Sequence, residues 1–205
     1  MSIDIFEKIK ENEHFLFFKK MFKNPRRLGA VAPSSQGLAD KIIECVDATG
    51  SGFIVEVGAG TGRFTESLLN SGVDPQRLVV IELDLELCSY LRKKFPQLNI
   101  VQANALDLES VLLKLEIYEV DSIISGIPLV NLSVKIRQQL FQVFTKVLAN
   151  DGAIIQFTYG FFSPIRYKKM GLQGRCAGVV MKNIPPATVW TYSVSKSDII
   201  YEKSA

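Results

Sequence analysis

The chain is predicted to be an α/β protein with a Rossmann-like, doubly wound, seven-stranded sheet, mostly parallel and ending in a C-terminal antiparallel hairpin. Short, continuously apolar runs alternate with amphipathic segments, as is typical of parallel strands covered on both faces. The first apolar run ends in closely spaced glycines, which favours a strand-to-helix turn that approaches a ligand. Near the C-terminus the runs 179–184 and 189–194 are separated too briefly for a parallel crossover, so they are expected to pair antiparallel.

The other elements follow from the two hydrophobic periods. One helix begins directly after the glycines, another stops before Pro96, and a long one is closed by the Asn-Asp-Gly run at 150–152. Residues 1–35 are expected to form an N-terminal amphipathic helix and a cap over the site, and residues 36–205 the ligand-binding domain. We expect helices over 37–46, 63–70, 85–95, 107–115 and 134–148, and strands over 53–57, 78–83, 99–102, 120–125 and 153–159.

Size and composition exclude several classes of protein. The 205 residues fit one domain with an appendage, and 47% hydrophobic with 22% charged residues is ordinary globular composition. The uncharged stretches are shorter than a membrane span, and the acidic residues soon after Met1 do not fit a secretory signal. The three cysteines are far apart, without CxxC pairs or clustered histidines, so we expect no disulfide framework, no metal site and a cytoplasmic location.

The excess positive charge lies at the amino terminus. The net charge is +3, and residues 1–27 hold seven basic and four acidic side chains, so the remainder is neutral. As a helix, residues 15–23 place Phe18 and Phe22 opposite Lys19, the pattern of a helix lying in an anionic membrane interface. The same pattern also fits a helix that packs its aromatic side chains on its own domain and leaves the lysines solvated.

A nucleotide-type loop joins the first strand to its helix in the run Val-Glu-Val-Gly-Ala-Gly-Thr-Gly at 55–62. Alternate glycines allow a tight turn and close approach of a ligand. Glu82 follows Gly62 by twenty residues, at the end of the next strand, where a carboxylate can accept hydrogen bonds from both hydroxyls of a ribose. Glu56 would repel a pyrophosphate but suits a cationic ligand. The alternative is a glycine turn that binds nothing.

This loop spacing and the strand count resemble those of the class I S-adenosylmethionine-dependent methyltransferases. The resemblance implies that the glycine loop lines the methionine part of the cofactor, that Glu82 holds the ribose, and that Asn104 meets the adenine amine where aspartate is usual. The cofactor-binding residues implied in this way are Glu56, Gly58, Ala59, Gly60, Thr61, Gly62, Glu82, Leu83, Asn104 and Ala105.

The loop after the fourth strand concerns the methyl acceptor. DNA and RNA adenine methyltransferases carry Asn/Asp-x-Pro-aromatic there, whereas this chain has Ser-Gly-Ile-Pro-Leu at 125–129, which counts against a flipped base as substrate. Together with segments 24–35 and 156–164, this loop resembles the bacterial phospholipid N-methyltransferases, which are related to the ribosomal RNA adenine dimethyltransferases. Phe161 departs from their pattern, where a proline is expected.

That resemblance implies a peripheral membrane enzyme that methylates phosphatidylethanolamine stepwise toward phosphatidylcholine. Presenting such an amine in its neutral form at pH 7 costs about 4–5 kcal/mol, if its pKa is near that of lysine, about 10.4. Tyr159 is the first candidate for orienting or relaying the proton and Ser125 the second. Tyr159 serving only in core packing is the alternative.

A basic loop at 161–175 follows the fifth strand and contains no acid. Because ligands bind at the carboxyl edge of such sheets, we expect Arg166, Lys168 and Lys169 to hold a phosphate head group beside the site. One alternative is that these residues form a solvated surface loop without a ligand. The same cations would bind RNA phosphates equally well.

The sequence is also compatible with three other functions. They are an RNA adenine N6-methyltransferase, a non-enzymatic membrane-binding protein that keeps the cofactor for stability, and a small-molecule methyltransferase. The sequence predicts neither the number of methyl groups transferred nor an oligomeric state.

Overall fold

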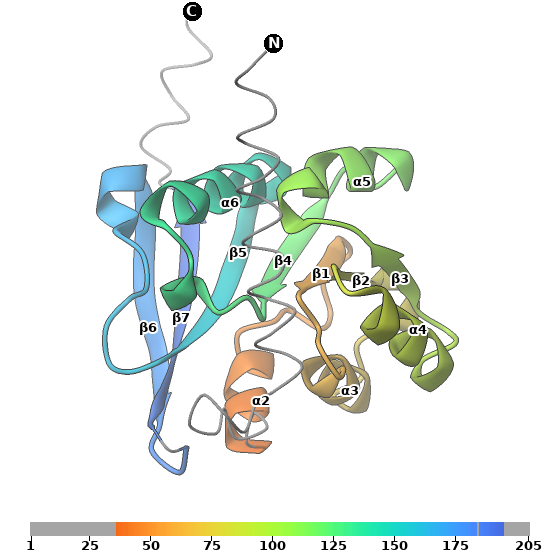
Figure 1. Cartoon of the computed structure of the whole chain (residues 1–205), viewed down its shortest axis with the longest axis horizontal. Coiled ribbons are helices and arrows are strands. Elements are labelled where there is room, and N and C mark those ends of the chain that lie inside the picture. Colours follow the sequence, from red (N-terminus) through yellow and green to blue (C-terminus); the bar gives the residue numbers. More distant parts are fainter. Residues whose placement is uncertain (1–35, 184, 195–205) are drawn as a thin grey trace, which may run out of the picture. The chain divides into compact units, whose positions relative to one another are not determined.

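A computed structural model describes residues 36–183 and 185–194. Seven strands form one sheet in the order β3-β2-β1-β4-β5-β7-β6 (Figure 1). The first five strands are parallel, β7 is antiparallel to β5, and β6 is antiparallel to β7. The predicted fold class is therefore confirmed. The strands are β1 (Phe53–Val57), β2 (Leu78–Glu82), β3 (Asn99–Gln102), β4 (Val120–Ser125), β5 (Leu148–Tyr159), β6 (Leu172–Val180) and β7 (Ala187–Val194).

Helices cover both faces of the sheet (Figure 1). On one face, side chains of α2, α3 and α4 share a buried cluster with alternate residues of β1, β4 and β5. On the other face, Phe141 of α6 meets Tyr192 of β7 edge-on, with ring centroids 5.3 Å apart. The helices are α2 (Gln36–Ile43), α3 (Arg63–Asn70), α4 (Leu85–Lys94), α5 (Leu108–Lys114) and α6 (Val134–Val147), with short 3₁₀ turns η2 (Pro75–Arg77), η3 (Ala105–Asp107), η4 (Leu129–Asn131) and η5 (Tyr167–Met170).

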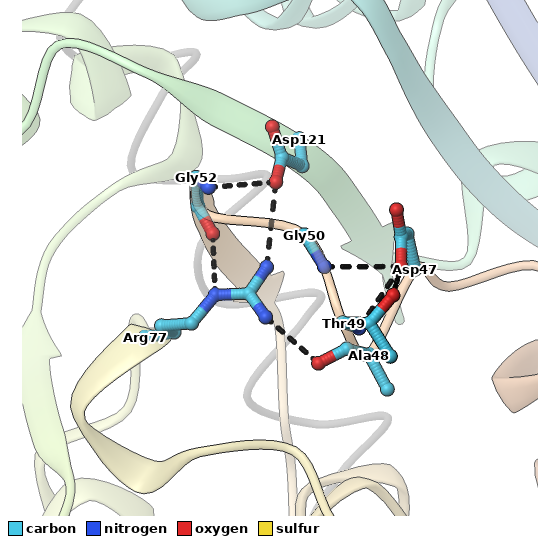
Figure 2. A network of polar contacts seen from close by, with 7 residues as sticks. All are labelled: Asp47, Ala48, Thr49, Gly50, Gly52, Arg77 and Asp121. Atoms are coloured by element: carbon cyan, nitrogen blue, oxygen red, sulfur yellow. Dashed lines mark hydrogen bonds and ion pairs between the residues drawn. The ribbon is translucent and has the colours of Figure 1, made fainter.

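The amino ends of the central strands are tied together by a polar network around Asp121 (Figure 2). The Gly52 N–H donates to Asp121 Oδ2 at 2.8 Å, and Arg77 Nη2 lies 3.3 Å from the same oxygen. Arg77 also donates to the carbonyls of Gly52 and Ala48, at 2.8 Å each. A Cβ at Gly52 would overlap the Asp121 carboxylate, so a larger residue there would displace this carboxylate from the network. Asp121 therefore anchors the fold at the edge opposite the glycine loop.

The last part of the sheet differs from expectation. The strand expected over 179–184 is wrong: β6 spans Leu172–Val180, and six residues connect it to β7. Two glycines and Arg175 interrupt the apolar pattern of this edge strand, so its sequence signal is weak. The strand expected from residue 153 begins at Leu148, so the Asn-Asp-Gly run lies inside β5 rather than after a helix. The expectations for residues 1–35, including Phe18, Lys19 and Phe22, lie outside the described residues.

Candidate active site

The glycine loop turns from β1 into α3 through three left-handed residues. Gly58, Gly60 and Gly62 have φ angles of 75°, 60° and 75°, a region that residues with a Cβ rarely adopt. The Gly58 N–H donates to the Ile81 carbonyl at 2.7 Å, which ties the loop to β2. A Cβ at Gly62 would lie 2.6 Å from side-chain atoms of α4 and of Phe95, so the helices pack closely behind the loop. Thr61 is exposed at the tip, whereas Ala59 is buried.

Glu56 is a fully buried carboxyl next to this loop. Its Oε2 accepts a hydrogen bond from Thr65 Oγ1 at 2.6 Å, and its Oε1 has no partner among the described residues. Desolvation, with a smaller contribution from the nearby Glu82 carboxylate, raises the pKa of Glu56 to about 7, and the hydrogen bonds from Thr65 oppose this rise. Buried polar atoms without partners point to a water or a ligand. A cationic group would both pair with Oε1 and lower the pKa again.

Glu82 ends β2 facing the loop. Its Oε1 accepts from the N–H groups of Leu83 and Asp84, at 2.7 and 3.0 Å, and its Oε2 accepts from the Gly60 N–H at 2.8 Å. A carboxylate offers about four lone-pair positions, so one is left. A ribose that places both hydroxyls on this carboxylate must therefore displace one of these three N–H groups.

Asn104 and Ala105 follow β3 at the same edge of the sheet. The Asn104 Oδ1 accepts from the Leu106 N–H at 3.0 Å and so begins η3. This oxygen keeps a second lone pair, which an adenine amine can use. Ala105 is buried behind it. Since β1, β2 and β3 are parallel neighbours, their carboxyl ends bring Glu56, Glu82 and Asn104 to one edge.

The loop after β4 packs directly against the glycine loop. The Gly126 N–H donates to the Val57 carbonyl at 2.8 Å, and a Cβ at Gly126 would overlap the Gly58 carbonyl oxygen. A Cβ at Gly58 would in turn lie 3.2 Å from Ile127. Leu129 is 2% exposed. The position of the amide in the Asn-x-Pro-aromatic element thus has no room for a side chain, and the residue in place of the aromatic ring is buried.

Ser125 and Tyr159 lie on opposite faces of the sheet. Ser125 pairs in register with Gln156, whereas Tyr159 belongs to the other set of alternating residues of β5 and packs against Phe157, with ring centroids 5.9 Å apart. Both hydroxyls are buried and have no partner within the described residues. Burial raises the pKa of Tyr159. The fold therefore does not combine these two side chains into one catalytic pair.

Comparisons with known proteins agree with this geometry. The family model for ribosomal RNA adenine dimethylase matches residues 21–158. The chain belongs to this family. It is 30% identical to the ornithine lipid N-methyltransferase of Singulisphaera acidiphila over 71% of this chain and 78% of that one. It is 36% identical to the ribosomal RNA small subunit methyltransferase A of Hahella chejuensis, but over 41% of this chain and 31% of that protein.

Solved structures show the same fold. A dimethyladenosine transferase from Plasmodium falciparum superposes with a TM-score of 0.57 at 18% identity, covering 82% of this chain and 64% of the other. A precorrin-6y C5,15-methyltransferase from Geobacter metallireducens gives a TM-score of 0.59 at 14% identity, covering 80% and 90%. This adenine dimethylase family member is an S-adenosylmethionine-dependent methyltransferase, and the left-handed glycines and the unpartnered Glu56 oxygen fit the cationic cofactor.

One expectation about this methyltransferase needs correction. The loop at 161–175 does begin at the carboxyl edge, but β6 runs parallel to β5, so the chain must return to the amino edge before β6 begins (Figure 1). Arg166, Lys168 and Lys169 lie just before Leu172. They are therefore separated from the cofactor edge by about 30 Å, the length of a nine-residue strand. They do not lie beside the site.

Two candidate residues beside these loops were not predicted from the sequence. Gln156 is 1% exposed, and its Nε2 donates to the Ile127 carbonyl at 3.1 Å, which holds the loop after β4. Arg63 begins α3, and its Nε is buried without a partner in the described part of the chain. A glutamine inside an apolar strand and an arginine directly after the third glycine were the available signals.

The described residues contain no group of three or more side chains that could hold a metal ion. Among them, no helix combines the length and the apolar composition that crossing a bilayer requires.

Proposed function

We propose that this methyltransferase transfers methyl groups to the amine of a membrane lipid head group. With phosphatidylethanolamine as the acceptor, successive transfers would lead toward phosphatidylcholine. The observation that carries the proposal is the contact between Gly126 and Gly58. An adenine acceptor needs an amide and a stacking ring after β4. Here the Gly58 carbonyl oxygen takes the space of the amide side chain, and Leu129 is buried. A flexible aliphatic amine needs neither group.

The extent of the similarities supports the same acceptor. The match to the lipid N-methyltransferase runs through most of both chains. The match to the ribosomal RNA methyltransferase of Hahella chejuensis leaves about two thirds of that protein without a counterpart here. That match covers 41% of this chain, whereas the match to the lipid enzyme covers 71% of it.

The cofactor site follows from the residues at the carboxyl edge. In this proposal Glu56 pairs with the cationic methionine end, the glycine loop lies along it, Glu82 and Leu83 bind the ribose, and Asn104 with Ala105 contacts the adenine. S-adenosylmethionine, when bound, supplies an electrophilic methyl group on a positively charged sulfur.

The acceptor amine must release a proton to solvent before it reacts, at a cost of about 4–5 kcal/mol at pH 7. Because burial raises the pKa of Tyr159, its hydroxyl stays protonated and acts as a hydrogen-bond partner rather than as a base. We place the amine N–H against the unpartnered Tyr159 oxygen, so that its lone pair faces the cofactor edge. Ser125, which lies on the opposite face, keeps at most a supporting role in this proposal.

Residues 1–35 are proposed to cap the site and, through Phe18, Lys19 and Phe22, to hold the protein peripherally at the cytoplasmic membrane face.

The test is methyl transfer with product analysis. The purified chain is incubated with methyl-labelled S-adenosylmethionine and vesicles that contain phosphatidylethanolamine or ornithine lipid, and the products are separated by chromatography. Labelled mono-, di- or trimethylated lipid is the expected result. Label in ribosomal RNA fragments without label in either lipid would replace the proposal by the RNA adenine alternative, which the family model itself favours.

A further inference from the structure

Charge is divided unequally between the two sides of the sheet. Residues 36–151 carry fifteen acidic and ten basic side chains, whereas residues 152–194, which form most of β5 and all of β6 and β7, carry five basic side chains and no acidic one. All five are exposed, and no ion pair to them occurs within the described residues. They are Arg166, Lys168, Lys169, Arg175 and Lys182.

These cations, which we call the β6 stripe, follow the outermost strand of the sheet from end to end (Figure 1). Three lie in or next to η5, just before β6 begins. Arg175 lies midway along β6, and Lys182 follows its last residue by two positions. The stripe therefore extends over about 30 Å along one side of the molecule.

Exposed apolar side chains gather where the β6 stripe reaches the cofactor edge. Phe162 is 87% exposed, Met181 67% and Phe161 58%. Tyr159 and Val180 both pair with Ala187, so the segments that carry these side chains leave the sheet two strands apart, a distance of about 10 Å. Phenylalanine and methionine exposed together beside cations indicate an interaction surface.

We propose that the β6 stripe and the side chains of Phe161, Phe162 and Met181 dock this protein on an anionic bilayer, with the sheet standing on its β6 edge. Cations near a membrane surface bind anionic head groups, and aromatic side chains insert at the interface. Lysines on an edge strand also prevent strand pairing. That role would not place phenylalanine and methionine in solvent beside them. This inference rests on the proposed function, because a lipid acceptor is what requires the enzyme to lie on a bilayer.

A native cysteine reports this docking without any measurement of activity. Cys176 lies on β6 and is exposed, whereas Cys88 is buried and Cys45 is half-buried. The full chain is treated with a negatively charged maleimide, and modification of Cys176 is followed by peptide mass spectrometry. Vesicles of phosphatidylglycerol and phosphatidylcholine should slow the reaction about tenfold, and phosphatidylcholine alone should not. A cysteine introduced by Lys114→Cys on α5 should keep its rate.

The second measurement is co-sedimentation with the same vesicles. It uses variants in which charges are reversed or an apolar side chain is replaced by a small polar one. Since each cation strengthens binding to an anionic surface about fivefold, Lys169→Glu with Lys182→Glu should weaken binding at least about tenfold. Phe162→Ser should also weaken it. The matched controls Lys93→Glu with Lys114→Glu, and Leu113→Ser, should not.

Unprotected Cys176, or equal losses in the variants and their controls, would overturn the inference. Weakened binding of an RNA oligonucleotide with undiminished vesicle binding in the Lys169→Glu, Lys182→Glu variant would overturn it too, in favour of an RNA surface. Failure of the proposed function looks different: no lipid is methylated, yet Cys176 is still protected by anionic vesicles.

Discussion

Glu56→Gln is the substitution that most sharply tests the electrostatics of the cofactor edge. Burial raises the pKa of this carboxyl from 4.5 to about 7. The folded protein therefore holds a proton between these values that the unfolded chain releases, and this group's contribution to stability is present below pH 4.5 and lost as the pH rises through about 7. The total effect is about 3 kcal/mol, of which about 2 kcal/mol falls between about pH 5.5 and pH 8.5.

Glutamine resembles the protonated carboxyl and can still accept the Thr65 hydrogen bond. The free energy of unfolding of Glu56→Gln, measured by urea denaturation without cofactor, should exceed that of the natural chain by about 2–3 kcal/mol at about pH 8.5 and should differ much less at about pH 5.5. Glu119→Gln, at an exposed position, is the control and should show neither difference.

Binding of the cofactor should change with pH in the opposite direction. The carboxylate form of Glu56 attracts a cation, so calorimetric affinity for S-adenosylmethionine should rise as the pH passes through about 7. The affinity for S-adenosylmethionine should fall at least about tenfold in Glu56→Gln, because the substitution removes a charged hydrogen bond. A stability gap between the two proteins that does not vary with pH would refute the reasoning about burial. Unchanged affinity would refute the assignment of Glu56 to the cationic end of the cofactor.

Three further substitutions test other contacts. Gly126→Asn, which restores the amide of adenine methyltransferases, should lower the melting temperature and abolish cofactor binding, because its Cβ overlaps the Gly58 carbonyl; calorimetry showing normal binding would contradict this. Gln156→Leu should free the loop after β4, so that kcat for lipid falls while cofactor affinity is kept; an unchanged kcat would remove the proposed positioning role. Arg77→Ala should destabilise the fold by about 1–3 kcal/mol in urea denaturation, because it leaves Asp121 half-paired; a change below about 0.5 kcal/mol would count against the network at the amino ends.

Much of the fold could be predicted because several strands are short apolar runs with clear ends. The first, third and fourth strands match the expected bounds. The first and fourth lie between glycine or charged residues and are buried on both faces, whereas the third is an edge strand whose two end residues are exposed. β6 could not be placed in this way. An edge strand with Gly174, Arg175 and Gly178 buries little, so its hydrophobic pattern is faint. The apolar run Val-Val-Met at 179–181 gave the stronger signal.

Some residues of the candidate site could likewise be predicted from local sequence, and others could not. The glycine loop and Glu82 follow from local sequence, because a strand-to-helix turn places them together. The relation between Ser125 and Tyr159 depends on the register of two strands, which shifts every side chain to the other face when it slips by one residue. The position of Lys168 and Lys169 depends on the direction of β6, which a prediction that misplaced this strand could not give.

The identity of the methyl acceptor is the central claim, and a competition experiment tests it directly. Equal amounts of amine-lipid vesicles and a ribosomal RNA fragment are mixed with the chain and labelled S-adenosylmethionine, and the label is counted in the organic and aqueous phases. We expect label in the lipid and none above background in the RNA. Label in the RNA alone would contradict it.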